Sequence, residues 1–220
     1  MPNYFAHESA IIDEGAQIGD DTKIWHFAHV FSGAVIGVGC SFGQNTMVSN
    51  GVKIGNNVKV QNNVAIYSGT TIEDDVFLGP SCVLTNISNP RSQVVRRGIY
   101  ESTLIRRGAT IGANATIVCG TTLGKYSFVA AGAVVTKDIP NYAMVAGVPA
   151  KQMGWMSRHG HRLEFNAEGI GVCPESKLRY QMSDCNSSQV VTCLDIGEDE
   201  SLPESLSQGK KSYRDFEKPY

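Results

Sequence analysis

The sequence predicts an all-β fold, a parallel β-helix in which short strands and sharp corners repeat every six residues. Thirteen consecutive positions spaced by six are large and apolar. They are Ile12, Ile18, Ile24, Val30, Ile36, Phe42, Val48, Ile54, Val60, Ile66, Ile72, Leu78 and Leu84. The fourth residue after each of the first twelve is small or β-branched, for example Ala16, Thr22 and Ala28. A strict period of six fits neither an α-helix nor a simple strand alternation, so it indicates a repeat architecture.

The repeat length has a direct physical interpretation. Six residues suffice for one short strand and one corner, and three such units complete a triangular coil of about 18 residues. Gly, Asn and Asp supply the backbone angles that the corners require. One coil cannot bury its inner face alone, whereas coils stacked at a strand spacing of about 4.8 Å share a continuous core.

Composition limits the classes of partner. A chain of 220 residues predicts one domain, or one domain with an appendage. The net charge of -2 argues against nucleic-acid binding, and without a run of about 20 apolar residues we expect no membrane span. The first residues lack a basic start and an apolar core, so we expect no signal peptide and a cytoplasmic protein. The six cysteines are then expected to be free thiols.

The register breaks after Leu84. The next run at a spacing of six begins at Ile105 and continues to Val135, and the gap before it is not a multiple of six. We therefore expect residues 85–104 to include a loop extruded from the coil, and such loops commonly carry the site of a solenoid.

The loop is rich in arginine. It contains Arg91, Arg96 and Arg97, and Arg106 and Arg107 lie just beyond it. Because guanidinium forks suit phosphate and carboxylate, we predict that these five residues cluster and bind an anion. The alternative is a solvated loop.

Two histidines and a run of amides stand out in the first block. His26 and His29 could contact the substrate or a neighbouring subunit; a zinc site needs a third ligand, and no further His follows in the repeat. We therefore expect no metal. Gln61, Asn62 and Asn63 exceed the needs of one corner, so we predict that they bind substrate, although corner chemistry is the simpler explanation for Asn.

The second block, residues 105–135, is rich in small residues. Small outer side chains at corners let a thin, extended ligand lie against the backbone, although corner packing explains them equally well. After the repeat, we expect a short helix over residues 150–159 that caps the last coil. The resulting division is a β-helix over 1–149, the helix and a small β appendage over 150–196, and a mobile tail over 197–220.

Several motifs resemble those of hexapeptide-repeat N-acetyltransferases that act on nucleotide-linked amino sugars. They are Trp25-His26-Phe27, Gln61-Asn62-Asn63-Val64, Thr85-Asn86, Asn89-Pro90-Arg91, the run from Arg106 to Asn114, and Ala146-Gly147-Val148-Pro149-Ala150-Lys151. The resemblance covers roughly residues 8–163 and is greatest for the WlbB/WbpD type. Those enzymes acetylate the 3-amino group of a UDP-linked 2-acetamido-3-amino uronic acid, on the route to bacterial lipopolysaccharide (O-antigen).

The resemblance implies further features. It implies a left-handed coil, which the usual right-handed crossover rule would not predict, and a homotrimer with sites between subunits. It also implies that acetyl-CoA lies along the second block at Ala113 and Ala131, with Lys137 and Lys151 near its phosphates.

Three further functions are compatible with the sequence. Enzymes that use dTDP-3-amino-3,6-dideoxyhexoses share several of these motifs, so such a sugar is the main competing acceptor. A metal-dependent hydratase would be similar to the carbonic anhydrases of this superfamily, and it would need three convergent His ligands. A non-catalytic scaffold would not bind coenzyme A.

Acetyl transfer to an amine constrains the roles of the residues. The amine attacks the thioester carbonyl, and backbone N–H groups can stabilise the oxyanion. A His base would be usual, but neither the loop nor the second block contains one. We therefore predict that Asn86 orients the amine or the carbonyl. We expect Arg91, or alternatively Arg96 or Arg97, to hold the carboxylate of a uronic acid.

Overall fold

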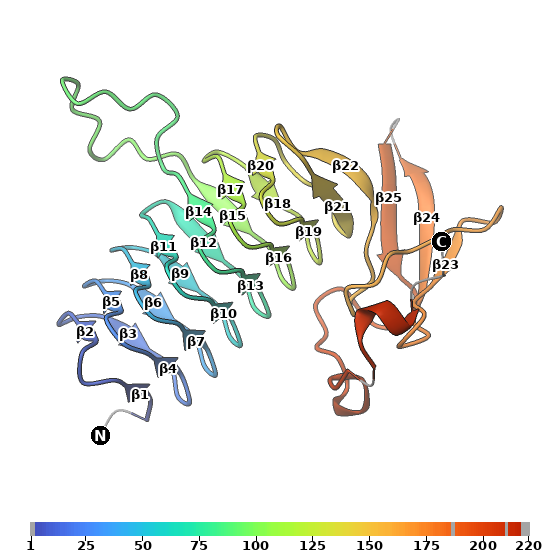
Figure 1. The fold of residues 1–220 in the computed structure, drawn as a ribbon, viewed down its shortest axis with the longest axis horizontal. Coiled ribbons are helices and arrows are strands. Elements are labelled where there is room, and N and C mark those ends of the chain that lie inside the picture. The colour runs from blue at the N-terminus through green and yellow to red at the C-terminus, as the bar shows by residue number, and fades with distance from the viewer. Residues whose placement is uncertain (1–2, 186–187, 210, 217–220) are drawn as a thin grey trace.

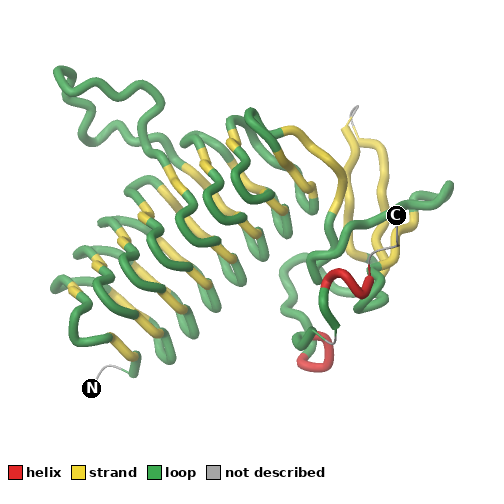
Figure 2. Tube along the Cα trace, viewed as in Figure 1, coloured by secondary structure: helices red, strands yellow, loops and turns green. Residues whose placement is uncertain are grey.

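The chain folds into a triangular solenoid followed by a small antiparallel sheet (Figure 1). The computed structural model describes residues 3–185, 188–209 and 211–216. Short strands separated by corners make up nearly all of it, and helix occurs only near the C-terminal end (Figure 2). The predicted all-β solenoid is therefore confirmed.

Three sheets form the faces of the solenoid. Face 1 contains β1 (Phe5–Ala6), β4 (Lys23–Ile24), β7 (Ser41–Phe42), β10 (Lys59–Val60), β13 (Phe77–Leu78), β16 (Thr110–Ile111), β19 (Phe128–Val129), β21 (Ala143–Ala146) and β22 (Lys151–Trp155). Face 2 contains β2 (Ile11–Ile12), β5 (His29–Val30), β8 (Met47–Val48), β11 (Ala65–Ile66), β14 (Val83–Leu84), β17 (Thr116–Ile117) and β20 (Val134–Val135). Face 3 contains β3 (Gln17–Ile18), β6 (Val35–Ile36), β9 (Lys53–Ile54), β12 (Thr70–Ile72), β15 (Thr103–Ile105) and β18 (Thr122–Leu123).

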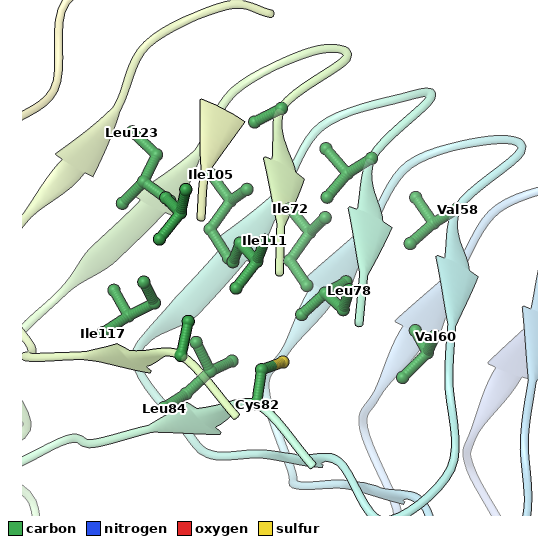
Figure 3. Packing of buried hydrophobic residues seen from close by; sticks show 14 of the residues in the cluster. Val58, Val60, Ile72, Leu78, Cys82, Leu84, Ile105, Ile111, Ile117 and Leu123 are labelled. Carbon is green, nitrogen blue, oxygen red and sulfur yellow. The ribbon is translucent and has the colours of Figure 1, made fainter. Parts of the chain in front are cut away.

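The large residue of each repeat points into the solenoid. Ile36, Ile54, Ile72 and Ile105 form one column on face 3, each in register with the next and each almost completely buried. Lys53, next to Ile54 on the same strand, is exposed, as the two-residue alternation of a strand requires. Figure 3 shows such columns from all three faces filling the interior. Face 2, with its seven strands, passes through seven coils.

One coil is longer than the others. Ile54 pairs with Ile72, 18 positions later, but Ile72 pairs with Ile105, 33 positions later, so this coil carries 15 additional residues. Together with the residues of an ordinary corner, they form the extruded loop, which leaves β14 and returns at β15 (Figure 1). The loop occupies residues 85–102, and the strand resumes two residues earlier than the sequence predicted.

The short helix expected over residues 150–159 is wrong. Lys151–Trp155 instead forms β22, which pairs antiparallel with β21. Gly154 has a φ of +152°, which is not helical backbone. The physical reason is the open end of face 1: a last parallel strand would leave a row of unpaired N–H and C=O groups, and β22 covers that row.

A three-stranded antiparallel sheet follows, consisting of β23 (Ile170–Val172), β24 (Arg179–Cys185) and β25 (Ser188–Cys193). Two short 3-10 helices, η1 (Glu204–Leu206) and η2 (Tyr213–Phe216), lie beyond it. None of the described residues belongs to a helix that is long and apolar enough to cross a membrane.

The appendage packs on the last coils through aromatic rings. The ring of Tyr180 on β24 meets that of Tyr142 edge-on at 5.5 Å between centroids, and Tyr142 stacks on Tyr126 of the preceding coil at 5.2 Å. The Arg158 guanidinium lies 4.2 Å above the ring of Tyr126. The structure differs from the expected mobile tail in its first residues, because the Tyr142 hydroxyl donates to Glu198 at 2.7 Å and Lys125 pairs with Asp199. Residues 210 and 217–220 of that tail lie outside the described residues.

The stacked core makes a direct prediction about stability. Ile72→Ala removes a buried side chain from a column that is fixed on both sides, so it should lower the free energy of unfolding by about 2–5 kcal/mol. Thr71→Ala, on the same strand but facing outward, should change it by less than about 0.5 kcal/mol. Urea denaturation followed by circular dichroism compares the two variants, and equal effects would contradict the inward orientation.

Candidate functional site

The corners of successive coils line up as three edges of the solenoid. Edge 1/2 joins face 1 to face 2, edge 2/3 joins face 2 to face 3, and edge 3/1 completes the triangle. Edge 1/2 contains six of the predicted site residues, namely His26, Gln61, Asn62, Asn63, Ala113 and Ala131. The sequence-predicted residues thus gather mainly on one edge, although they come from four different coils.

The N-terminal part of edge 1/2 is closed by its own side chains. Asn62 Oδ1 accepts a hydrogen bond from the backbone N–H of Gln44 at 2.9 Å, and Asn63 Oδ1 accepts one from Asn45 at 3.2 Å. Asn63 also has a φ of 61°, a conformation that Asn tolerates better than most residues. These two amides therefore perform corner chemistry, while Gln61 is half-buried beside them.

The C-terminal part of the same edge is open. Ala113 and Ala131 occupy the corner position of Gln44 and Asn62, but an alanine on the next coil offers no side-chain acceptor. Within the described residues, the backbone N–H groups of Ala113 and Ala131 donate to no protein acceptor. The result is a ledge of small side chains with two free N–H groups, one coil or about 4.8 Å apart. We call these two residues the alanine ledge.

Close packing beneath the ledge requires glycine. A Cβ atom added at Gly112 would lie 2.5 Å from the backbone nitrogen of Ala131, well inside van der Waals contact. The backbones of two successive coils therefore lie very close together beneath the ledge, and glycine leaves the room for this approach.

The two predicted lysines are exposed and lie near the C-terminal end of the solenoid, on different strands. Lys137 comes two residues after β20, and Lys151 opens β22. Ala150 ties the two segments together, because its N–H donates to the Val134 carbonyl at 2.7 Å. Ala113, Ala131 and Lys151 thus lie on or next to edge 1/2, whereas Lys137 lies across face 2 on edge 2/3.

The two histidines lie in the second coil. The ring of His26 stacks on that of His7 at 3.5 Å between centroids, and its buried Nδ1 atom has no hydrogen-bond partner among the described residues. His29 Nε2 lies 3.0 Å from Asp13 Oδ1. Both are three coils, or roughly 14 Å, from the coil that carries Asn86, so neither reaches that residue within one chain.

Potential metal ligands do not assemble at these histidines. Among the residues that the structure describes, no three His, Cys, Asp or Glu side chains are grouped so that they could hold a metal ion.

Asn86 lies at the base of the extruded loop, on edge 2/3. Its carbonyl accepts a hydrogen bond from the Glu101 N–H at 3.0 Å, whereas its half-buried side-chain amide bonds to none of the described residues. Farther along the loop, Arg91 and Arg97 are exposed, and Arg96 Nε donates to the Asn89 carbonyl at 3.0 Å. Of the three arginines in the loop, Arg91 and Arg97 thus have exposed guanidinium groups, whereas Arg96 uses its Nε atom for a hydrogen bond within the loop.

The predicted cluster of five arginines is wrong. Arg106 and Arg107 lie on edge 3/1, one strand beyond the loop. Arg107 donates to Asp75 at 2.8 Å and also pairs with Asp74, and its side chain is 15% exposed. Arg106 Nε lies 3.6 Å from Glu73. The corner acids of the preceding coil neutralise both cations, so closeness in sequence did not mean closeness in space.

Three residues that no sequence motif marks lie at the base of the loop. Ser88, Glu101 and Cys119 meet there, with Ser88 bonded to Glu101 and in contact with Cys119. No spacing rule could have found them, because an irregular loop brings the first two together and the repeat register supplies the third.

The ledge and Asn86 lie at opposite edges of face 2. A strand of that face and its flanking residues separate edge 1/2 from edge 2/3 in every coil. One chain therefore does not bring the alanine ledge and the predicted catalytic residue Asn86 into a single pocket.

Comparison with known proteins gives consistent matches. Residues 51–86 and 102–137 match the family "Bacterial transferase hexapeptide (six repeats)". The chain is 42% identical over 187 residues to dTDP-3-amino-3,6-dideoxy-alpha-D-galactopyranose 3-N-acetyltransferase of Aneurinibacillus thermoaerophilus, covering 85% of this chain and 95% of that protein.

Solved structures match more distantly. One is a Bacillus cereus gene product described as an acetyltransferase, with 24% identity and a TM-score of 0.49 over 70% of this chain and 85% of that chain. Another is a hexapeptide-repeat acetyltransferase of Vibrio cholerae in complex with acetyl coenzyme A. It has 28% identity and a TM-score of 0.43 over 53% of this chain and 70% of that chain.

Proposed function

Because this chain belongs to the family of bacterial hexapeptide-repeat transferases and is an acetyl-CoA-dependent N-acetyltransferase, we propose that its acceptor is the 3-amino group of a dTDP-linked 3-amino-3,6-dideoxyhexose. The family's repeats build a left-handed parallel β-helix, which is the fold class predicted from the sequence. The observation that carries the proposal is the 42% identity to a relative named for such a sugar, over 95% of that relative's length. The UDP-linked uronic acid, placed first from sequence, is the second candidate.

The alanine ledge fits the donor. The pantetheine arm of coenzyme A is thin and carries two amides, and their carbonyls can accept hydrogen bonds from the free N–H groups of Ala113 and Ala131. Lys151, exposed at the start of β22, is suited to the phosphates at the far end of the cofactor, and so is the exposed Lys137, which lies across face 2 on edge 2/3.

The reaction needs little acid–base chemistry from the protein. The neutral sugar amine attacks the thioester carbonyl and forms a C–N bond and a tetrahedral oxyanion. The C–S bond then breaks, and the departing thiolate takes the proton from nitrogen, so amide and free coenzyme A result. Positioning accounts for much of the rate acceleration in this scheme. Asn86 positions the reactants through its unbonded side-chain amide. His26 and His29 are too far from Asn86 within the chain to act as the base.

The split site implies a partner subunit. A ledge on edge 1/2 and an Asn86 on edge 2/3 come together when two copies pack side by side, so the proposal includes the homotrimer with sites between subunits. The extruded loop projects from the solenoid as such an arrangement requires (Figure 1). A role in bacterial surface polysaccharide synthesis and a cytoplasmic location belong to the same proposal.

Two arginines of the loop favour the second candidate acceptor, the UDP-linked uronic acid. Arg91 and Arg97 are exposed, and no carboxylate of the described residues neutralises either of them. A uronic acid would offer one carboxylate in addition to the diphosphate, and a dideoxyhexose would not.

The two candidate acceptors give opposite outcomes in one assay. Thiol release from acetyl-CoA should be fastest with dTDP-3-amino-3,6-dideoxyhexoses and slower with the UDP-linked 3-amino uronate. If the uronate is preferred instead, Arg91→Ala or Arg97→Ala should reduce its kcat/KM by about 10- to 100-fold through loss of a charged hydrogen bond. Arg214→Ala, an exposed position in η2, serves as the control. Thiol release with none of these sugars would refute the proposed acceptor class.

The ledge generates a prediction about the donor. Ala131→Asn places an acceptor next to the Ala113 N–H, as Asn62 does for Gln44, and adds bulk to the ledge. The KM for acetyl-CoA should rise about tenfold or more, because the hydrogen bond and the open surface are both lost. The KM for the sugar should stay unchanged.

The matched control for this variant is Val38→Asn. Val38 occupies the same corner position on edge 3/1, where its N–H already donates to Asn56 at 2.8 Å. An unchanged acetyl-CoA KM in Ala131→Asn would place the cofactor elsewhere.

A further inference from the structure

The two ends of the extruded loop are joined by three hydrogen bonds. The Glu101 N–H donates to the Asn86 carbonyl at 3.0 Å. In return, the carboxylate of Glu101 accepts from the backbone N–H and from the hydroxyl of Ser88, each at 2.9 Å. Each carboxylate oxygen thus has its own donor, and the outgoing and returning segments are joined at Asn86 and two residues beyond it, at Ser88.

The next coil supports this base. Cys119 is buried, its N–H donates to Thr85 Oγ1 at 2.9 Å, and its Sγ lies 3.6 Å from Ser88 Oγ. Gly120 leaves room for the carboxylate, because an added Cβ there would lie 3.2 Å from Glu101 Oε2. We call the two hydrogen bonds between Ser88 and Glu101 the tie. The tie is supported by contacts with the next coil of the solenoid and is therefore not an isolated contact within a loop.

The carboxylate acts in its charged form. The hydrogen bonds from the Ser88 hydroxyl and backbone N–H hold the pKa of Glu101 below its ordinary value. A lowered pKa means that the tie contributes fully above the ordinary pKa of Glu and is lost as the pH falls through the lowered value. At neutral pH Glu101 is ionised, and hydrogen bonds to an ionised acceptor are stronger than neutral ones.

We propose that Glu101 is a positioning residue for acetyl transfer, which holds Ser88 and the Asn86 backbone so that the Asn86 side chain is fixed toward the acceptor amine. Glu101 does not touch the substrate in this role. The inference rests on the function proposed for Asn86, and it adds a residue to the machinery that no repeat motif identifies. The hydrogen bonds fix the loop at residues 86, 88 and 101, so the segment that carries Asn86 is held against the solenoid.

Three variants and one control test the role. Glu101→Ala removes both bonds to Ser88. Glu101→Gln can keep both, with its carbonyl accepting from the backbone and its amide donating to the hydroxyl, but without the charge. Ser88→Ala removes the hydroxyl bond only. Ser92→Ala, exposed in the same loop and away from this base, is the matched control.

Steady-state kinetics separate positioning from general damage. Glu101→Ala should lower kcat by roughly tenfold or more, because misplacement of an orienting group is costly. Its KM for acetyl-CoA and its melting temperature should match those of the wild type, since the ledge and the core are untouched. Glu101→Gln and Ser88→Ala should lie between Glu101→Ala and the wild type, and Ser92→Ala should equal the wild type. An unchanged kcat in Glu101→Ala overturns the proposal, as does a parallel loss of melting temperature.

Limited proteolysis tests the loop without any assumption about the substrate. Trypsin can cut after Arg91, Arg96 and Arg97, and cleavage should be faster in Glu101→Ala than in the wild type and in Ser92→Ala. Equal cleavage rates would overturn the proposal even if kcat falls. If the wild type acetylates no sugar of the panel, the proposed function fails, and the trypsin comparison still decides whether Glu101 holds the loop.

Discussion

The structure depends on one constraint, the in-register stacking of each large inward residue on the residue one coil earlier. The strand hydrogen bonds run between coils, so the register of one coil sets the position of the next. Ile36, Ile54 and Ile72 show this on face 3, where the pairing is regular and the side chains are buried. Once the register is set, every corner recurs at the same edge, and the edges become straight rows of equivalent positions.

That regularity lets one corner position serve two purposes. On edge 1/2, Asn62 uses its amide to satisfy the N–H of the coil below. Two coils later, Ala113 leaves its own N–H free because Ala131 provides no acceptor. Exchanging amide for alanine at an otherwise identical position thus converts a self-satisfied corner into a surface that can bind an amide-containing ligand.

The extruded loop departs from the register without disturbing it. Its 15 additional residues leave and return at one edge, so Ile72 still stacks on Ile105. The tie between Ser88 and Glu101 closes the loop where it meets the solenoid. The loop and the alanine ledge lie on opposite edges of face 2, a separation that the proposed site between copies of the chain would bridge. Arg106 and Arg107 lie apart from both, since the acids of edge 3/1 hold them.

The sequence by itself determined the solenoid, its inward residues and the place of the extruded loop, because a strict period depends on local spacing alone. The small size of Ala113 and Ala131 is also visible without a structure, but it fits corner packing equally well, and only the resemblance to known transferases predicts a cofactor there. Other features depend on which segments meet in space. Only the tertiary structure decided that Asn62 and Asn63 act as corner amides, that Lys151 begins a strand and not a helix, and that Glu101 holds the loop at its base. These outcomes rest on hydrogen bonds to the neighbouring coil, to the open edge of face 1 or across an irregular loop, and no periodicity in the sequence records such partners.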